Sequence, residues 1–477
     1  MKATRIEPAA DFGAARTIVA ALVEKARAAQ KIFARSTQEQ LDETATAVGW
    51  AIMSPARNQA LAELAVKDTG LGVVADKIAK NHRKTLGLLR DLKGAKSTGV
   101  IAEHPERGIT EIARPAGVVA AVIPSTNPAA TPANNIINAL KCGNAVIVAP
   151  SPKGHGTAAL LLQYVNRELG RTGAPPDLVQ LLPAPVTREL TNEVMRQCDL
   201  VVVTGSQNNV RAGYSSGKPA LGVGTGNVAV IVDESADCAD AARKIMASKI
   251  FDNATSCSSE NSVIVHGKVY DRMLGALARE GGALLSAAEK AALQRAMFPG
   301  GKLSAEVTAQ PVKRICAVAG LGRAELVNAK CLIVEETGAG RDFPFSGEKL
   351  SPVLTLYRAR DFEHAFEIVR AIYDYQGDGH SLGVYTEDES HIRRLAHEMT
   401  VARVIVKQAH TFATGGSFDN GMPFSLSMGC GTWGGNSFTD NLNYRHFLNI
   451  TRIVRTIPER KPSEKELFGS YWKKYGK

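Results

Sequence analysis

The chain has 477 residues, of which 44% are hydrophobic, so it can bury large cores and is expected to fold as two or three domains. The formal net charge of +10 favours anionic ligands, but Lys and Arg are spread along the sequence, which argues against nucleic-acid binding. Seven cysteines without a CxxC pair do not suggest a disulfide framework, and no metal site is indicated. We expect a cytoplasmic protein, since no apolar run of about 18 residues and no apolar N-terminal core points to a membrane or to secretion.

Residues 14–89 are rich in Ala, Leu, Lys, Arg and Glu and are predicted to be helical. Apolar residues recur there at helical spacing, as at Ile18, Leu22 and Ala26. The next segment, residues 100–112, is typical of two short strands around a Pro/Gly turn. We interpret it as an exposed hairpin for subunit contact.

Four short apolar runs rich in β-branched residues predict strands of one parallel sheet with helices on both faces; they are residues 118–123, 145–148, 200–203 and 228–232. In such sheets ligands bind at the carboxyl ends of the strands. The loops after the first three runs carry small or hydrogen-bonding residues that could hold phosphate groups. They contain Pro124, Ser125, Pro150, Ser151, Lys153, Thr204, Gly205 and Ser206.

A second α/β unit is predicted after residue 232. Its predicted elements are helices at 240–248 and 362–372 and strands at 262–265, 331–334 and 353–356. Two Gly-rich stretches near the C-terminal end of this unit are expected to be loops in which backbone segments approach closely; they are residues 415–417 and 428–437.

Cys257 is the best candidate for a nucleophile. It lies among small hydroxyl residues, between a helix-like run and an apolar run. A thiol is strongly nucleophilic once deprotonated, and small neighbours let a carbonyl carbon approach it. A single cysteine is more often a buried, inert residue, but the surrounding pattern favours the nucleophile.

Two other motifs carry weaker signals. Residues 213–217 match the GxSxG pattern of serine hydrolases, but a polar, helix-like segment precedes them where that motif needs a strand. Residues 222–226, Gly-Val-Gly-Thr-Gly, are similar to a dinucleotide fingerprint but precede a strand instead of following one. Neither motif defines a function by itself.

Six segments, in order, resemble the aldehyde dehydrogenase superfamily, and most closely its CoA-acylating branch, which includes part of the bifunctional aldehyde-alcohol dehydrogenases. They are residues 123–128, 214–220, 222–227, 251–253, 348–352 and 429–437. The resemblance implies an α/β fold with a Rossmann-type cofactor domain, an α/β catalytic domain and an oligomerisation hairpin, assembled as a homodimer or homotetramer. It divides the chain into an N-terminal helical part of the cofactor domain (1–95), the hairpin (96–115), the cofactor-binding domain (116–232), the catalytic domain (233–440) and a C-terminal oligomerisation strand with a basic tail (441–477).

The resemblance also implies roles for individual residues. Cys257 is the expected nucleophile, and Asn127 is the expected donor to the oxyanion of a thiohemiacetal. Hydride then passes to NAD or NADP and leaves a thioester. Glu348 is expected to contact the nicotinamide ribose, although a plain surface acid is the alternative. The remaining expected cofactor contacts are Pro124, Ser125, Pro150, Ser151, Lys153, Thr204, Gly205, Ser206 and Gly224.

Two departures from hydrolytic aldehyde dehydrogenases bear on the reaction. Those enzymes place a water-activating glutamate in the loop around Gly222, and this chain has Gly-Val-Gly there. A thiol acceptor needs less help because it is partly ionised near neutral pH, so coenzyme A is the expected acceptor. Residues 149–152 are Ala-Pro-Ser-Pro and lack the acid that binds the adenosine ribose. With Lys153 adjacent to this segment, NADP is a possible cofactor as well as NAD.

The expected substrate is a short aldehyde. The loop 253–261 is similar to that of acylating sulfoacetaldehyde dehydrogenases, and hydroxyls of Thr255, Ser256 and Ser258 could solvate a sulfonate or merely satisfy the loop backbone. Acetaldehyde stays open. Two other functions are weighed as well: an aldehyde dehydrogenase that uses water or phosphate as acceptor, and a catalytically silent scaffold subunit that docks through the basic tail 461–477.

Overall fold

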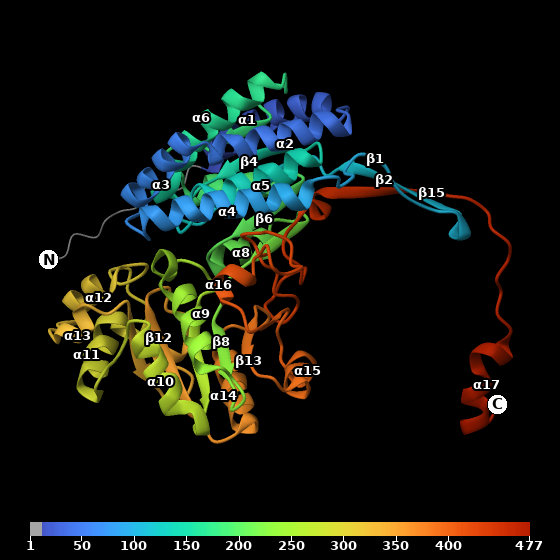
Figure 1. The fold of residues 1–477 in the computed structure, drawn as a ribbon. Helices are drawn as coiled ribbons and strands as arrows, with labels where there is room; N and C mark the ends of the chain where they lie inside the picture. Colours follow the sequence, from blue (N-terminus) through green and yellow to red (C-terminus); the bar gives the residue numbers. More distant parts are fainter. Residues whose placement is uncertain (1–11) are drawn as a thin grey trace.

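The computed structural model describes residues 12–477, which form two α/β lobes and a projecting arm (Figure 1). Residues 1–8, the N-terminal segment without an apolar core, lie outside the described residues. Four helices occupy the region predicted to be helical: α1 (Phe12–Phe33), α2 (Gln38–Met53), α3 (Pro55–Thr69) and α4 (Val74–Leu92). Short turns separate them, and Gly70 ends α3 in a left-handed conformation.

The first lobe is built on a five-stranded parallel sheet in the order β5-β4-β3-β6-β7. Its strands are β3 (Val118–Val122), β4 (Ala145–Ala149), β5 (Val179–Leu181), β6 (Leu200–Thr204) and β7 (Ala220–Val223). Every residue of β3 and β4 is buried, as expected for Val, Ile and Ala strands between two helical layers. The predicted strands 118–123, 145–148 and 200–203 are therefore confirmed.

Helices cover both faces of this sheet. The chain runs from β3 to β5 in one direction along the sheet and from β5 to β7 in the other, so right-handed crossovers place the connecting helices on opposite faces. The connecting helices are α5 (Ala130–Lys141) and α6 (His155–Arg171) on one face and α7 (Arg188–Gln197) and α8 (Gln207–Tyr214) on the other. Helix α2 packs on α5 and α6, and α1 packs on α7.

The second lobe contains a seven-stranded parallel sheet in the order β10-β11-β12-β9-β8-β13-β14. Its strands are β8 (Val228–Val232), β9 (Glu260–His266), β10 (Gly282–Leu284), β11 (Cys331–Glu335), β12 (Val353–Ala359), β13 (Leu382–Tyr385) and β14 (Val404–Val406). Its helices are α9 (Cys238–Ile250), α10 (Tyr270–Arg279), α11 (Ala287–Met297), α12 (Val312–Ala319), α13 (Ala324–Val327), α14 (Phe362–Tyr375), α15 (Glu389–Glu398) and α16 (His410–Ala413).

One strand belongs to a different sheet from the one predicted. The run 228–232 was expected in the first sheet, but β8 pairs with β9 and β13 in the second. Its apolar, β-branched residues fit either sheet, and composition alone does not indicate which neighbours a strand pairs with. The chain crosses from β7 to β8 through residues 224–227, which therefore connect the two sheets.

The arm is a three-stranded antiparallel sheet that projects from the first lobe. The predicted hairpin is present as β1 (Gly99–His104) and β2 (Ile109–Pro115), and β15 (Leu448–Val454) pairs with β2 from the far end of the chain. Helix α17 (Glu464–Tyr475) follows, has no buried residue and lies away from both lobes (Figure 1).

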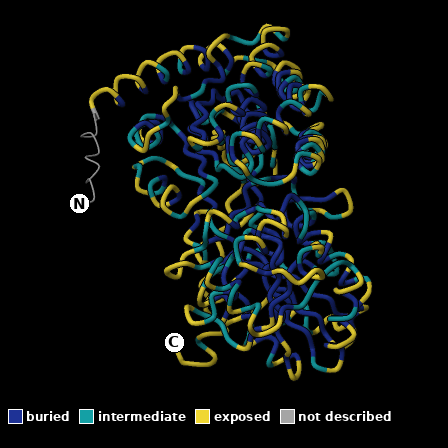
Figure 2. Tube along the Cα trace, turned by 90° about the vertical axis from the view of Figure 1, so that its left-hand side faces the viewer, coloured by how far each residue is buried: buried dark blue, intermediate teal, exposed yellow. Residues whose placement is uncertain are grey.

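The interior segments of both lobes are buried and are drawn as dark blue tube in Figure 2. One apolar cluster fills the first lobe, and separate clusters lie on the two faces of the second sheet. None of the helices between residues 12 and 477 combines the length and the apolar character needed to cross a membrane.

Candidate active site

A cavity of about 430 Å³ is lined by residues of both lobes. The first sheet contributes the loops that follow β3, β4 and β6, and the second lobe contributes the segment before β9. Of the predicted site residues, the cavity brings together Cys257, Asn127, Pro124, Ser125, Ser151, Thr204, Gly205, Ser206, Gly224 and Glu348. Residues far apart in the sequence thus meet where the carboxyl ends of the first sheet's strands face the second lobe.

The loop that carries Cys257 has an unusual backbone. Asp252, Asn253 and Ala254 have φ angles of 52°, 50° and 58°, a left-handed conformation that non-glycine residues seldom adopt. Such residues cost of order 1–3 kcal/mol each and persist only where the surroundings hold them. The backbone also passes close to Gly226, where an added Cβ would lie 2.1 Å from the Cys257 carbonyl oxygen. This contact explains a glycine between β7 and β8.

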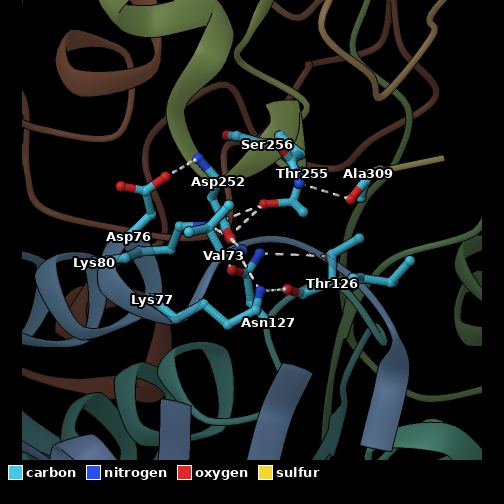
Figure 3. Close-up of polar contacts among 12 residues, drawn as sticks. Val73, Asp76, Lys77, Lys80, Thr126, Asn127, Asp252, Thr255, Ser256 and Ala309 are labelled. Carbon is cyan, nitrogen blue, oxygen red and sulfur yellow. Dashed lines mark hydrogen bonds and ion pairs between the residues drawn. The ribbon is translucent and has the colours of Figure 1, made fainter. Parts of the chain in front are cut away.

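Asp252 anchors this loop to α4 of the first lobe (Figure 3). Its buried carboxylate accepts hydrogen bonds from Lys77 Nζ at 3.1 Å, Lys80 Nζ at 2.5 Å, the Val73 backbone N–H at 2.7 Å and Thr255 Oγ1 at 2.7 Å. These donors hold the pKa of Asp252 below its usual range, against the effect of burial. The carboxylate is therefore ionised and binds the nucleophile's loop to the other lobe.

Asn127 lies directly beside this anchor. Lys80 Nζ donates to Asn127 Oδ1 at 2.9 Å, so the amide oxygen is already occupied (Figure 3). The amide nitrogen makes one long contact, 3.4 Å, with Thr126 Oγ1. Asn127 therefore keeps an N–H donor for a ligand in the cavity, which is the capacity that an oxyanion donor needs.

The Cys257 thiol is protonated in this environment. Burial, followed by the carboxyl group of Glu348, raises the pKa of Cys257 to about 12. His380 Nε2 lies 3.4 Å from Cys257 Sγ. Burial, followed by the charge of Arg403, lowers the pKa of His380 to about 3, so its imidazole is neutral and its Nε2 can accept a hydrogen bond from the thiol.

A chain of polar side chains positions His380. Its Nδ1 lies 2.7 Å from Ser381 Oγ, which lies 2.8 Å from His410 Nε2. Arg403 donates to the His380 carbonyl oxygen at 3.1 Å. These contacts fix the imidazole so that Nε2 faces the thiol.

Glu348 supplies the single carboxyl group among the cavity-lining residues of the described chain. Burial raises its pKa to about 8, and its Oε1 is buried without a hydrogen-bond partner in the described residues. An orphaned buried carboxyl oxygen suits a hydroxyl-bearing ligand. This observation fits the ribose of a nicotinamide cofactor and argues against the alternative that Glu348 is a plain surface acid.

The loops after β4 and β6 start short helices with hydroxyl caps. Ser206 Oγ accepts from the Asn209 N–H at the start of α8, and Ser151 Oγ accepts from the Gly154 N–H. A neighbouring hollow of about 380 Å³ includes Pro150 and shares Ser151 and Ser206 with the main cavity. The two hollows together give room for a dinucleotide along the strand ends.

Lys153 is the one predicted cofactor residue that lies outside both hollows. It is exposed in the turn before α6 and lines neither of them. Arg188 in the second hollow is the cation that lies there instead. Sequence reasoning placed Lys153 by its position after the strand, which does not indicate where a long side chain points.

Several residues that shape the site were missed from the sequence. Asp252, His380, Ser381 and His410 become evident once the fold brings them to Cys257. His380 did carry a signal, since it stands in a Gly-His-Ser run directly before the buried strand β13. The cations of α4 were also missed, because they lie in a stretch that was predicted only to be helical.

Comparison with known proteins agrees with this site. The aldehyde dehydrogenase family model matches residues 8–326. An acylating sulfoacetaldehyde dehydrogenase of Cupriavidus necator is 61% identical over 97% of this chain and 94% of its own. An acetylating succinate-semialdehyde dehydrogenase of Clostridium kluyveri is 38% identical over 94% of this chain and 98% of its own. The structure of an acetylating aldehyde dehydrogenase from Geobacillus thermoglucosidasius superposes with a TM-score of 0.90 at 34% identity, covering 95% of this chain and 99% of that one. The resemblance seen in the sequence motifs is confirmed, and the chain belongs to the aldehyde dehydrogenase family.

Proposed function

We propose that the protein oxidises sulfoacetaldehyde, a short anionic aldehyde, with NAD or NADP and transfers the acyl group to coenzyme A. The observation that carries this proposal is the thiol of Cys257 beside a neutral imidazole, in a cavity whose described lining contains no carboxyl group other than Glu348. Similarity to acylating relatives supports the acceptor, and the sulfoacetaldehyde relative supports the substrate.

The reaction begins at Cys257. Its sulfur forms a bond to the aldehyde carbon while the thiol proton moves to His380 Nε2, so a free thiolate is not required beforehand. The carbonyl oxygen becomes an oxyanion and accepts a hydrogen bond from the Asn127 amide nitrogen. Lys80 holds the Asn127 oxygen and so prevents the amide from turning round.

The cofactor and the acceptor complete the sequence. A bound nicotinamide would supply the acceptor for the hydride of the aldehyde carbon, with release of one proton. The residues that would hold the cofactor are Glu348 and the hydroxyl loops after β4 and β6. The coenzyme A sulfur then bonds to the thioester carbon, the bond from Cys257 breaks, and the thiol proton ends on Cys257.

Water is a poor acceptor in this site. Hydrolytic enzymes carry a water-activating glutamate in the loop around Gly222, whereas here Gly222 lies in β7 with the Tyr214 hydroxyl against its backbone, and no carboxylate of the described residues replaces that glutamate. We propose that either cofactor is accepted, because the second hollow has no acidic residue in its described lining to repel a 2′-phosphate and contains Arg188.

We further propose that the arm, residues 96–115 with 441–477, serves self-association as a dimer or tetramer, while residues 1–95 and 116–232 hold the cofactor and 233–440 carry the nucleophile. Exposed apolar side chains support this role, among them Val454 at 72% and Tyr471 at 60% exposure. Seven free cysteines support a reducing, cytoplasmic location.

Nicotinamide reduction at 340 nm tests the function. Purified protein is mixed with sulfoacetaldehyde or acetaldehyde and NAD or NADP, with coenzyme A, with phosphate, or with neither. Turnover that depends on coenzyme A is expected, together with a loss of several orders of magnitude in Cys257→Ala. Equal rates without any added acceptor would mean that water releases a free acid. No turnover with any aldehyde would favour a silent scaffold.

A further inference from the structure

Helix α4 presents a row of cations to the cavity. Lys80, Arg83 and Lys84 all line it, and the i, i+3, i+4 spacing places them on one helical face. Lys80 and Lys84 are 6% and 8% exposed. Burying cations is costly unless something compensates their charge, so this row requires an explanation.

The carboxylates nearby compensate a part of this charge. Asp252 pairs with Lys77 and Lys80 together, so one negative charge faces two positive charges. Lys84 and Arg83 form no ion pair with any of residues 12–477 within 4.0 Å. Lys84 Nζ donates to the Gly415 carbonyl oxygen at 2.6 Å, and Arg83 donates to Ser417 Oγ at 2.9 Å. Ser417 Oγ in turn donates to Asp419, whose carboxylate compensates part of the Arg83 charge, whereas the partner of Lys84 is neutral.

The cations are held in place beside unused hydrogen-bonding capacity. The rings of Phe412 and Phe424 lie 5.5 Å and 5.6 Å from Arg83 and Lys84, which restricts both side chains. Thr411 is 6% exposed and lines the same cavity, yet its Oγ1 has no hydrogen-bond partner in the described chain. An anion between these groups would satisfy the hydroxyl and balance the charge.

The row is close to the reacting atoms. Lys80 contacts Asn127 directly, and Lys84 is one helical turn further along α4 and lines the same cavity as Cys257. Glu348 and the hydroxyl loops that suit the cofactor come from other elements. A group held by Lys84 is thus a part of the molecule that reacts with Cys257.

We propose that Arg83, Lys84 and the Thr411 hydroxyl form a subsite for the anionic tail of the aldehyde, a sulfonate or a carboxylate. The subsite rests on the proposed function and deepens it, because it selects aldehydes whose carbonyl carbon is joined by a short linker to an anion. Lys80 separates this tail from the oxyanion site at Asn127.

Charge removal tests the subsite. Lys84→Gln and Arg83→Gln keep hydrogen-bonding capacity and remove the charge, and Lys93→Gln removes a charge from the exposed end of the same helix as the matched control. Each protein is assayed with sulfoacetaldehyde, succinate semialdehyde and acetaldehyde, and KM is measured for aldehyde and for coenzyme A. Loss of a charge-assisted hydrogen bond predicts a fall of about 10- to 100-fold in the ratio of kcat/KM for sulfoacetaldehyde over acetaldehyde, mainly through KM. Lys93→Gln should keep the wild-type ratio.

The three aldehydes and the two KM measurements distinguish the possible ligands of the subsite. A loss shared by succinate semialdehyde supports a subsite for anionic tails in general, and a loss confined to sulfoacetaldehyde supports a sulfonate subsite. An unchanged ratio in active variants overturns the subsite, as does an effect confined to the KM for coenzyme A. Absence of any coenzyme A-dependent turnover in the wild type refutes the proposed function instead.

A competition measurement on the wild-type protein tests the subsite without depending on whether the variants fold. 2-Hydroxyethanesulfonate carries the anionic tail without a reactive carbonyl, and ethylene glycol lacks the charge. We expect 2-hydroxyethanesulfonate to compete with acetaldehyde at a concentration at least about tenfold lower than ethylene glycol does, because only the sulfonate can form the charge-assisted hydrogen bond. Equal inhibition by the two compounds would overturn the subsite.

Discussion

Replacement of His380 tests the step on which the mechanism depends. The change His380→Gln keeps a hydrogen-bonding group near Cys257 Sγ, 3.4 Å away in the native protein, but removes the basic nitrogen. General base catalysis contributes about 10²- to 10⁴-fold. We therefore expect a loss of that size in the rate of the acylation half-reaction.

The pKa values of the pair define how the proton moves. The pKa of the Cys257 thiol is raised to about 12 and that of the His380 imidazole is lowered to about 3, both chiefly by burial. A stable thiolate and imidazolium pair is therefore disfavoured, and the proton must transfer as the carbon–sulfur bond forms. Neither group should titrate between pH 5 and 10, since both pKa values lie outside that interval.

A single-turnover measurement checks this reasoning. Enzyme in excess over NAD is mixed with aldehyde without coenzyme A, and the burst of reduced nicotinamide is followed from pH 6 to 9. A burst rate for His380→Gln within tenfold of the wild type would refute the assignment. Binding of NAD, measured separately, should be preserved, because His380 is 1% exposed and lies outside the cavity lining.

The remaining predictions concern the same site. Asn127→Ala should lower kcat by about 10²- to 10³-fold with little change in NAD affinity, as for one lost oxyanion donor, and a change confined to NAD affinity would move Asn127 to cofactor binding. Asp252→Asn leaves Lys77 and Lys80 buried without a carboxylate, so it should lower the free energy of unfolding by about 3–5 kcal/mol in urea titrations, and an unchanged midpoint would contradict the anchor. Gly226→Ala should fold but lose most activity, because the new methyl group meets the Cys257 backbone, and full activity would show that this contact is dispensable. Burial, then Arg83 and Lys80, lowers the pKa of Lys84 to about 7, and Lys84 lines the same cavity as Cys257. The ammonium charge is lost as pH rises, so KM for sulfoacetaldehyde should increase above pH 7 while KM for acetaldehyde does not. Parallel pH profiles for the two aldehydes would refute this role of the Lys84 charge.

Local chemistry predicted the parts of the site that stand within one motif. Cys257 was recognisable because it lies in a short run of small polar residues next to an apolar strand, whereas the expected role of Asn127 came from the resemblance to the family. The strands β3, β4 and β6 were recognisable because buried parallel strands are continuous apolar runs. Their order in the sheet then brings the three following loops to one edge.

Contacts between distant segments could not be predicted in this way. Asp252 lies five residues before Cys257 in the sequence, but its role depends on Lys77 and Lys80 from the other lobe. Short strands such as β5, β7 and β14 have three or four residues and gave no periodic signal. The cations of α4 were not recognised because sequence does not indicate which face of a helix a neighbouring lobe will cover.

Helix α4 therefore links three parts of the site. Through Lys77 and Lys80 it holds Asp252, and with it the left-handed loop before Cys257. Through Lys80 it orients the Asn127 amide, and through Lys84 it offers a charge to the substrate's tail. Because the strained loop persists only while Asp252 is held, loosening α4 should disturb the nucleophile and the oxyanion donor together. Helix α4 is in this respect part of the site as well as a packing element of the fold.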